Sequence, residues 1–495
     1  MKIFLYILFF SFYLIFTLDE QNLRKTLNDE NIKYLEFSFK RNLTITDSLK
    51  PEELIKTLFY NQIYVNIKIG TNKKEIPFYL YLQQYPLVIQ SSNVSNKQVK
   101  GIYNKSESDT YEAIGKEESF IVDDMSYAIL SKDNFYFNND NTQSLISFYL
   151  CVENYEKTHI TEGGKIGLKL YSTSAHSEKS SFISILKKNR IISSYVFSII
   201  YDTKDFNEDT GKLYIGAYPH ILDKKHYTED YFISGEANNV AGNIEWNLNF
   251  DEIKVDNKLV EKNSNSYFYI EIGFLIGKKA YFNYIKSLDI WNEYFNINKK
   301  CHEAHFKIDD LETNDIEPRL NDDYSVYYCD KDVDIEKLNF GDISFVKKSR
   351  NISFEFTNKD LWMEKNGYKY FLIIENQFFN DNWYLGKPFF KKYPMVFDSD
   401  NKIIGLYTKT IENNNSNETD NSTSSTLVYI IVIIGLVIIV IGLIILLINC
   451  YMKLPRKMRP NELTDDNYDY SNPIKLKKKA EFFPVSPFLI KSYSI

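Results

Sequence analysis

One short stretch of the sequence gathers residue types that bind metals, Cys301-His302-Glu303-Ala304-His305. Cysteine, histidine and glutamate are all ordinary zinc ligands. The zinc-peptidase pattern His-Glu-x-x-His places its histidines four residues apart, whereas His302 and His305 are three apart. The sequence also contains no P-loop, dinucleotide-binding fingerprint or nucleophile elbow. It therefore predicts neither a bound metal nor a cofactor.

The composition and the residue patterns of the chain as a whole predict β-strands. Aromatic residues make up 16% of the chain, and they favour pleated, half-buried surfaces. Ile63–Thr71 alternates apolar and polar residues up to a glycine turn, and Ile76–Leu82 resumes the strand, which predicts a β-hairpin. Further strands are expected at 253–255 and 267–274, in a second lobe that begins near Trp246. At 495 residues the chain has room for more than one core.

The stretch 382–406 carries the most distinctive pattern in the chain. Two aromatic runs flank Gly386-Lys387-Pro388, and the second turns over residues 398–401 into a short strand, which predicts a β-meander. This stretch resembles the closing segment of the pepsin-like aspartic peptidases. That segment reads Trp-Ile-Leu-Gly-Asp-x-Phe, then a Tyr, Val-Phe-Asp, a turn and Ile-Gly-Phe.

The resemblance extends over most of the chain, from about Gln62 to Tyr407. Ile67-Lys68-Ile69-Gly70-Thr71 is similar to the family's opening strand, and Gly163–Leu168 stands where the family has Asp-Gly-Ile-Leu-Gly-Leu. The resemblance implies an all-β, bilobal fold with an inter-lobe cleft. The N-terminal lobe is expected at 61–225 and the C-terminal lobe at 240–410.

The resemblance also implies where the catalytic acids belong. Aspartic peptidases hydrolyse amides with two carboxylates that share one proton across a water molecule. The positions that match the two aspartates are Gln83 and Glu271. An amide cannot exchange a proton at working pH, and glutamate is one methylene longer than aspartate. The hydroxyl groups that brace the two loops are replaced as well, by Gln84, Ile272 and Phe274.

Asp209-Thr210-Gly211 spells the family's catalytic tripeptide at a different place in the chain. It follows polar residues and precedes the strand Lys212–Ile215, so it predicts a structural hairpin turn. The tyrosine that the family lays over its substrate is expected between Gly101 and Tyr127. Three candidates remain open: Tyr103, Tyr111 and Tyr127.

The resemblance pairs Cys301 with Cys329 in a second-lobe disulfide, which requires an oxidising compartment. Cys151 follows an apolar run and is expected to be a buried, unreactive thiol. Asn-x-Ser/Thr sequons allow glycosylation at seven positions: Asn42, Asn93, Asn104, Asn351, Asn414, Asn417 and Asn421.

The two ends of the chain predict membrane targeting. Residues 1–17 read as a signal peptide, and 18–60 as a propeptide-like extension that contains one alternating stretch, Tyr34–Arg41. Residues 411–426 form a polar stalk and 427–449 an apolar span long enough to cross a bilayer. Basic residues follow the span at once, which places the tail, 450–495, in the cytosol. The sequence therefore predicts a single-pass type I protein of the secretory pathway or cell surface, with its ectodomain lumenal or extracellular.

These features support one leading hypothesis of function and two alternatives. The first is a membrane-anchored pseudopeptidase that binds an extended peptide or protein in its cleft. The second is an active aspartic endopeptidase that uses Glu271 with Asp109, Asp123 or Asp124. The third is a glycosylated surface or adhesion scaffold. A net charge of -7 is small for this length and argues against nucleic acid as a partner.

Overall fold

The computed structural model describes the chain between residues 32 and 408 with gaps, namely 32–41, 49–83, 87–92, 103–120, 126–137, 142–154, 163–169, 181–202, 205–237, 239–240, 243–307, 323–350, 352–377 and 382–408. The predicted signal peptide, stalk, membrane span and tail lie outside these residues. Within the described ranges, no helix is both long and apolar enough to cross a membrane.

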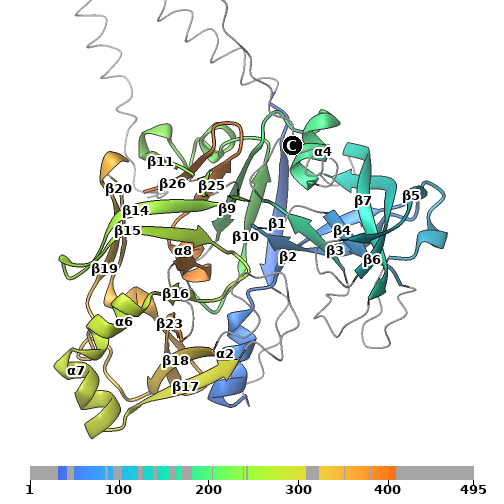
Figure 1. Ribbon diagram of the computed structural model, residues 1–495. Coiled ribbons are helices and arrows are strands. Elements are labelled where there is room, and N and C mark those ends of the chain that lie inside the picture. Colours follow the sequence, from blue (N-terminus) through green and yellow to red (C-terminus); the bar gives the residue numbers. More distant parts are fainter. Residues whose placement is uncertain are drawn as a thin grey trace, which may run out of the picture. The chain divides into compact units, whose positions relative to one another are not determined.

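Two large sheets make up the fold (Figure 1). The 13-stranded sheet has the order β11-β26-β25-β9-β10-β1-β2-β3-β8-β4-β7-β6-β5. Its strands are β1 Leu35–Arg41, β2 Ile63–Ile69, β3 Lys74–Tyr81, β4 Leu87–Gln90, β5 Glu112–Phe120, β6 Ser126–Phe137, β7 Thr142–Asn154, β8 Gly164–Gly167, β9 Val196–Tyr201, β10 Thr210–Ile215, β11 Phe232–Glu236, β25 Met395–Asp398 and β26 Ile403–Tyr407.

The 11-stranded sheet builds the second lobe, and a separate two-stranded ribbon joins β12 (Asn239–Val240) to β13 (Asn243–Ile244). The strands of the larger sheet are β14 Asn247–Val255, β15 Lys258–Phe268, β16 Leu275–Gly277, β17 Cys301–Lys307, β18 Asp323–Asp330, β19 Ile343–Lys347, β20 Ile352–Phe356, β21 Trp362–Lys365, β22 Tyr368–Phe371, β23 Ile373–Asn376 and β24 Trp383–Leu385.

Helices are short. The α-helices are α2 Pro51–Phe59, α4 Phe182–Lys188, α5 Pro219–Leu222, α6 Lys279–Lys286, α7 Asp289–Trp291 and α8 Lys387–Lys392. Short 3-10 helices lie at η1 Lys105–Glu107, η2 Glu229–Tyr231, η5 Lys348–Arg350 and η6 Asn358–Leu361, and a π-helix lies at η3 Asn292–Ile297. The described part of the chain is thus an all-β, bilobal fold, as predicted.

The predicted hairpin is confirmed. Strands β2 and β3 pair antiparallel, with Val65 opposite Phe78 and Ile67 opposite Ile76. The alternate residues of β2 are buried, because successive side chains of a strand point to opposite faces. The hairpin leads directly to Gln83, two residues beyond the end of β3.

The predicted β-meander at 382–406 is wrong. Trp383–Leu385 forms β24 in the second-lobe sheet, whereas β25 and β26 belong to the 13-stranded sheet. Helix α8 lies between them and begins at Lys387, with Pro388 in its first turn, where the fixed φ of proline suits a helix. The predicted strand 267–274 is also shorter than expected. Strand β15 ends at Phe268, and the chain then turns through Glu271.

Candidate active site

The side chain of Gln83 connects the two lobes. Its amide nitrogen donates to the carbonyl oxygens of Phe268, 2.9 Å away, and Trp246, 3.2 Å away. Its amide oxygen accepts from the backbone nitrogen of Trp246 at 3.3 Å. Both amide protons and one oxygen lone pair are therefore engaged with the second lobe. The residue that the sequence resemblance matches to the first aspartate is buried, and its side chain links the two lobes.

Trp246 reinforces this link. Its indole nitrogen donates to the carbonyl oxygen of Leu168 in the first lobe, 2.7 Å away. Its ring packs edge-on against Phe197 and Phe397, with centroid distances of 5.8 and 5.1 Å. Trp246 is fully buried, so its indole N–H needs this partner. Gln83 and Trp246 together fix the start of β14 to the first lobe.

Glu271 lies in the turn that follows β15, and its side chain is 4% exposed. Its carboxylate oxygen Oε2 lies 3.5 Å from the backbone nitrogen of Leu82, the residue before Gln83. Its own carbonyl oxygen accepts from the backbone nitrogen of Asn61 at 2.8 Å. The fold therefore brings together the two loops that the sequence singles out, but it supplies a carboxylate from only one of them.

A close approach of two chain segments requires the glycine that follows. The carbonyl oxygen of Leu58 would lie 1.8 Å from a Cβ atom at position 273, so no side chain fits there. Gly273 donates its backbone N–H to the carbonyl oxygen of Phe59 at 2.7 Å. The Glu271-Ile272-Gly273 turn thus takes its shape against the segment at the end of α2.

The alternative acids do not supply a second carboxylate from the described part of the chain. The backbone nitrogen of Asp109 lies 3.1 Å from the hydroxyl of Thr71, in the turn before β3. Gln83 follows the opposite end of that eight-residue strand, roughly 25 Å away at the usual strand rise. Asp123 and Asp124 lie outside the described residues.

The three tyrosine candidates fall in different places. Tyr103 is buried and donates to the carboxylate of Asp133 at 2.7 Å, and burial together with this bond raises its pKa. Tyr111 packs beside Tyr103 and hydrogen-bonds the hydroxyl of Ser131. Tyr127 lies in β6 opposite Ser119 of β5, near the turn of the β5–β6 hairpin. Tyr103 is therefore a core residue and does not cover the site.

Asp209 belongs to the Asp-Thr-Gly tripeptide that lies outside the two candidate loops. Its carboxylate is the centre of a buried ionic cluster. Its carboxylate lies 2.7 Å from Lys387, 3.2 Å from Arg41 and 3.6 Å from Lys391, and all four side chains are at most 7% exposed. Thr210 and Gly211 are the first residues of β10, which pairs antiparallel with β9. The tripeptide therefore belongs to a hairpin, as predicted, but it starts a strand and does not form the turn, which lies at residues 206–207. The aspartate has a further structural role, as the carboxylate shared by three cations.

Burial governs the charge of this cluster. Lys387 is completely buried, and desolvation lowers its pKa to about 7, although Asp209 opposes the shift. Burial lowers the pKa of Lys391 as well. Lys387 also donates to the carbonyl oxygen of Phe206 at 2.7 Å, which satisfies a second of its three protons. One carboxylate and backbone carbonyls therefore stabilise the three cations.

Sequence reasoning missed this cluster, although one signal for it was present. The related peptidases have aspartate in Gly-Asp-x-Phe, whereas this chain has Lys387 at that position. A charge reversal inside an apolar motif requires a new counter-ion, because an isolated buried ammonium is very costly. Asp209 supplies that counter-ion from a segment 178 residues away.

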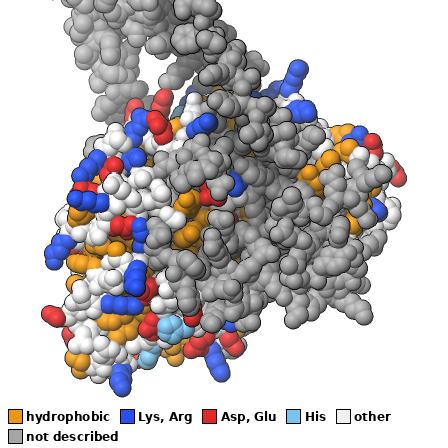
Figure 2. All heavy atoms as spheres, in the orientation of Figure 1, with side chains coloured by type: hydrophobic (Ala, Val, Ile, Leu, Met, Phe, Trp, Pro, Cys, Tyr) orange, Lys and Arg blue, Asp and Glu red, His pale blue; other side chains and the backbone are white. Residues whose placement is uncertain are grey.

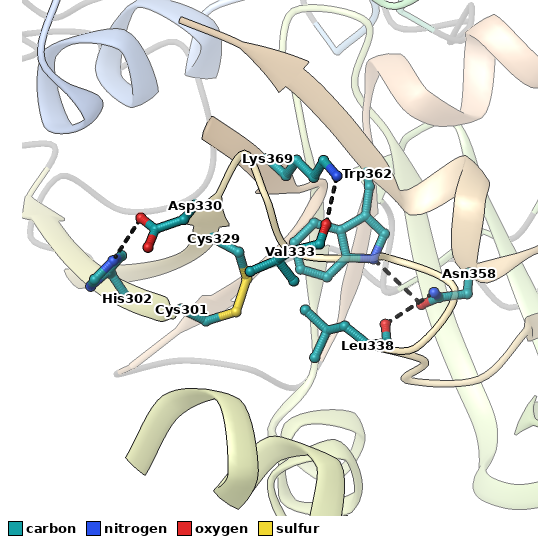
Figure 3. The surroundings of a disulfide bond; sticks show 9 residues. All are labelled: Cys301, His302, Cys329, Asp330, Val333, Leu338, Asn358, Trp362 and Lys369. Atoms are coloured by element: carbon teal, nitrogen blue, oxygen red, sulfur yellow. Dashed lines mark hydrogen bonds and ion pairs between the residues drawn. A yellow bond between two sulfur atoms is a disulfide. The ribbon is translucent and has the colours of Figure 1, made fainter. Parts of the chain in front are cut away.

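The disulfide joins Cys301 and Cys329 at the paired ends of β17 and β18 (Figure 3). Beside it, His302 faces Asp330, with 3.4 Å between the ring nitrogen and the carboxylate oxygen. His302 and His305 are three positions apart on β17, so they point to opposite faces of the strand. Among the described residues, no group of three or more His, Cys, Asp or Glu side chains is placed to hold a metal.

Cys151 is buried in β7, as predicted. Of the seven sequons, only that of Asn104 is described. The Asn104 side chain accepts from the backbone nitrogen of Ser106 at 3.2 Å, and its amide donates to Glu107 at 3.0 Å. The other six asparagines lie outside the described residues. Figure 2 shows Lys and Arg side chains interspersed with Asp and Glu over the described surface of one face.

Two β-sheet lobes with paired loops at Gln83 and Glu271 define a pepsin-like fold. A family model described as "Eukaryotic aspartyl protease" matches residues 62–409. The chain belongs to this family. A search of curated proteins found no match.

Proposed function

We propose that this protein is a membrane-anchored pseudopeptidase that binds an extended peptide or protein segment between its two lobes. The observation that carries the proposal is the side chain of Gln83, whose amide is engaged by Trp246 and Phe268. A residue with this role cannot be one half of a proton-sharing pair of acids.

Glu271 alone does not supply the missing chemistry. In the two-acid mechanism one carboxylate takes a proton from water while the other, protonated, hydrogen-bonds the substrate carbonyl. Both roles have to be filled at the same time, and Gln83 can fill neither. A displacement of about 1 Å can already cost on the order of a hundredfold in rate. Glu271 is therefore the remnant of a dyad and is not a catalyst.

The inter-lobe position of the binding site rests on membership of the aspartyl protease family, and the mode of binding rests on a sheet edge of the first lobe. In the strand order of the described residues, β5 comes last in the 13-stranded sheet and pairs with β6 alone. A strand with one unpaired edge can add an extended peptide through backbone hydrogen bonds. The membrane part rests on the apolar segment 427–449 and the basic residues that follow it.

The test of binding uses the ectodomain, residues 18–425, and a library of extended peptides with fluorescent labels. We expect saturable binding to a subset of peptides and slower amide exchange in β5 when a peptide is bound. The hairpin tip between β14 and β15 serves as an internal reference that should not change. Absence of saturable binding across the library would overturn the peptide-binding role and favour a scaffold.

A further inference from the structure

We infer that β1 and residues Pro51–Asn61 are a permanent part of the folded protein and are not removed during maturation. The resemblance to secreted peptidases would class these residues with a removable propeptide. The inference is independent of whether Glu271 retains any activity. It rests on the pairing of β1, the packing of α2, the contacts of residues 58–61 and the buried ionic cluster.

Strand β1 is an interior strand of the 13-stranded sheet. It pairs with β10 over six register positions, from Leu35 opposite Ile215 to Lys40 opposite Thr210. On its other side, Phe39 pairs with Val65 and Arg41 with Ile63 of β2. In the strand order β1 is the link between β10 and β2. Its removal would uncover two long strand edges, which are sites of aggregation.

Helix α2 packs its apolar face against the second lobe. Leu54, Ile55, Leu58 and Phe59 recur at helical spacing, and each is at most 2% exposed. The ring of Phe59 contacts Phe306 and Tyr324, each at a centroid distance of 5.4 Å. Figure 1 shows α2 beside the end of β17, with which it is in contact. The helix therefore completes the core of the second lobe.

The chain after α2 supports the loop that carries Glu271. Phe59 accepts from Gly273, Tyr60 forms a β-bridge with Ile272, and Asn61 donates to Glu271. The side chain of Asn61 donates to the carbonyl oxygen of Ile270 at 2.8 Å and to the hydroxyl of Tyr201 at 2.9 Å. Without these residues the turn at 271–273 would lose its backbone partners.

The ionic cluster fixes β1 and α2 to each other and to the body of the protein. Arg41, the last residue of β1, donates to the carbonyl oxygens of Thr57 at 3.1 Å and Tyr60 at 2.9 Å. Its other terminal nitrogen reaches Asp209, which also holds Lys387. Loss of Arg41 would leave carbonyls at the end of α2 without their donor. The guanidinium therefore connects three separate chain segments.

The first test is limited proteolysis of the folded full-length protein in detergent, followed by size exclusion and peptide mapping. Trypsin has potential cleavage sites at Lys40, Arg41 and Lys56. We expect the peptides of β1 and α2 to remain with β14–β18 until the whole fold unfolds. Release of these peptides from a core that stays folded would overturn the inference. So would a mature protein, purified from a eukaryotic secretory host, whose chain begins after Leu35, because it would lack part or all of β1.

The second test removes the shared carboxylate with Asp209→Asn. We expect amide exchange in β1 and α2 to become at least tenfold faster, while exchange in β17 and β18 changes little. Asp332→Asn is the matched control, because Asp332 forms an exposed ion pair with Lys300. If Asp209→Asn does not fold, Arg41→Lys tests the same contacts, since lysine keeps the charge but loses the planar fork. Unchanged exchange in the folded variant would contradict the role of the cluster.

Discussion

The side-chain amide of Gln83 lies 2.9 Å from the carbonyl oxygen of Phe268, and this hydrogen bond joins the first lobe to the second. In the related peptidases the matching residue is an aspartate that shares a proton with its counterpart. The glutamine side chain is not an acid, and in this structure it links the two lobes.

This link predicts that Gln83 stabilises the fold. Gln83→Ala removes a hydrogen-bond partner from the backbone N–H of Trp246 and from the carbonyl oxygens of Trp246 and Phe268, although the Trp246 carbonyl keeps the N–H of Phe268 at 2.9 Å. A buried backbone group left unsatisfied costs about 1–3 kcal/mol. We expect the free energy of unfolding to fall by at least about 2 kcal/mol in urea titrations. Gln83→Asp should destabilise as well, because a carboxylate cannot donate to either carbonyl oxygen.

Gln377→Ala is the matched control for this experiment. Gln377 is exposed and its amide makes a hydrogen bond to the hydroxyl of Ser325. Its loss should change the free energy of unfolding by less than about 0.5 kcal/mol. Equal stability of Gln83→Ala and Gln377→Ala would show that the inter-lobe bonds contribute nothing.

The buried lysine predicts an unusual dependence of stability on pH. The pKa of Lys387 is about 7 in the folded protein, against an ordinary value of 10.5. Between these values the unfolded chain holds a proton that the folded chain lacks. The free energy of unfolding should therefore rise from pH 7 to pH 9, by at most about 1.4 kcal/mol per pH unit for this group. Urea titrations at several pH values measure the slope.

Lys387→Met should reduce that slope, because methionine does not titrate. Some slope should remain, since burial also lowers the pKa of Lys391. Lys337→Met, at an exposed lysine, should leave the slope as it is. If the slope is unchanged in Lys387→Met, this result would contradict the lowered pKa assigned to Lys387.

Much of the fold could be predicted because the relevant signals are local. The alternation in Ile63–Thr71 defines a hairpin whatever the rest of the chain does, and the motif residues define the family. The prediction of a β-meander was wrong because it depends on contacts that are not local. Only tertiary pairing decides that β24 and β25 belong to different sheets. The ionic cluster depends on Arg41, Asp209 and Lys387, whose distant positions give no periodic signal.

The candidate site was predictable in position but not in geometry. The resemblance marks Gln83 and Glu271, and the fold brings their loops together through Leu82. The direction of the Gln83 side chain depends on Trp246 and Phe268, which lie 163 and 185 residues further along the chain. No local pattern encodes such a contact.

The disulfide predicts a specific cross-link and a measurable stabilisation. Peptide mapping without reduction should recover Cys301 linked to Cys329, with Cys151 unlinked. The sequence separation is 28 residues, and closing a loop of this length is worth roughly 3–4 kcal/mol in the chain-entropy model. Cys301→Ser together with Cys329→Ser should lower the free energy of unfolding by about that amount. A peptide that links Cys151 to either partner would contradict the lobe assignment.

The apolar segment 427–449 predicts the topology of the chain in membranes. Protease added to sealed vesicles, with the lumen protected, should remove only residues after Cys450. Epitope tags at the N-terminal side of Gln62 and at Ile495 report the two ends separately. Digestion of the ectodomain in sealed vesicles would contradict the orientation that the basic residues predict.

The most direct measurement of the central claim is peptide hydrolysis by the purified ectodomain, residues 18–425, between about pH 3 and pH 7, where two-acid peptidases operate. An active member of the family serves as the positive control, and mass spectrometry of an unstructured peptide library detects cleavage at any site. We expect no hydrolysis above the level of Glu271→Ala, and no activity in Gln83→Asp. Cleavage by the unmodified ectodomain that disappears in Glu271→Ala would contradict the pseudopeptidase assignment and establish an active peptidase.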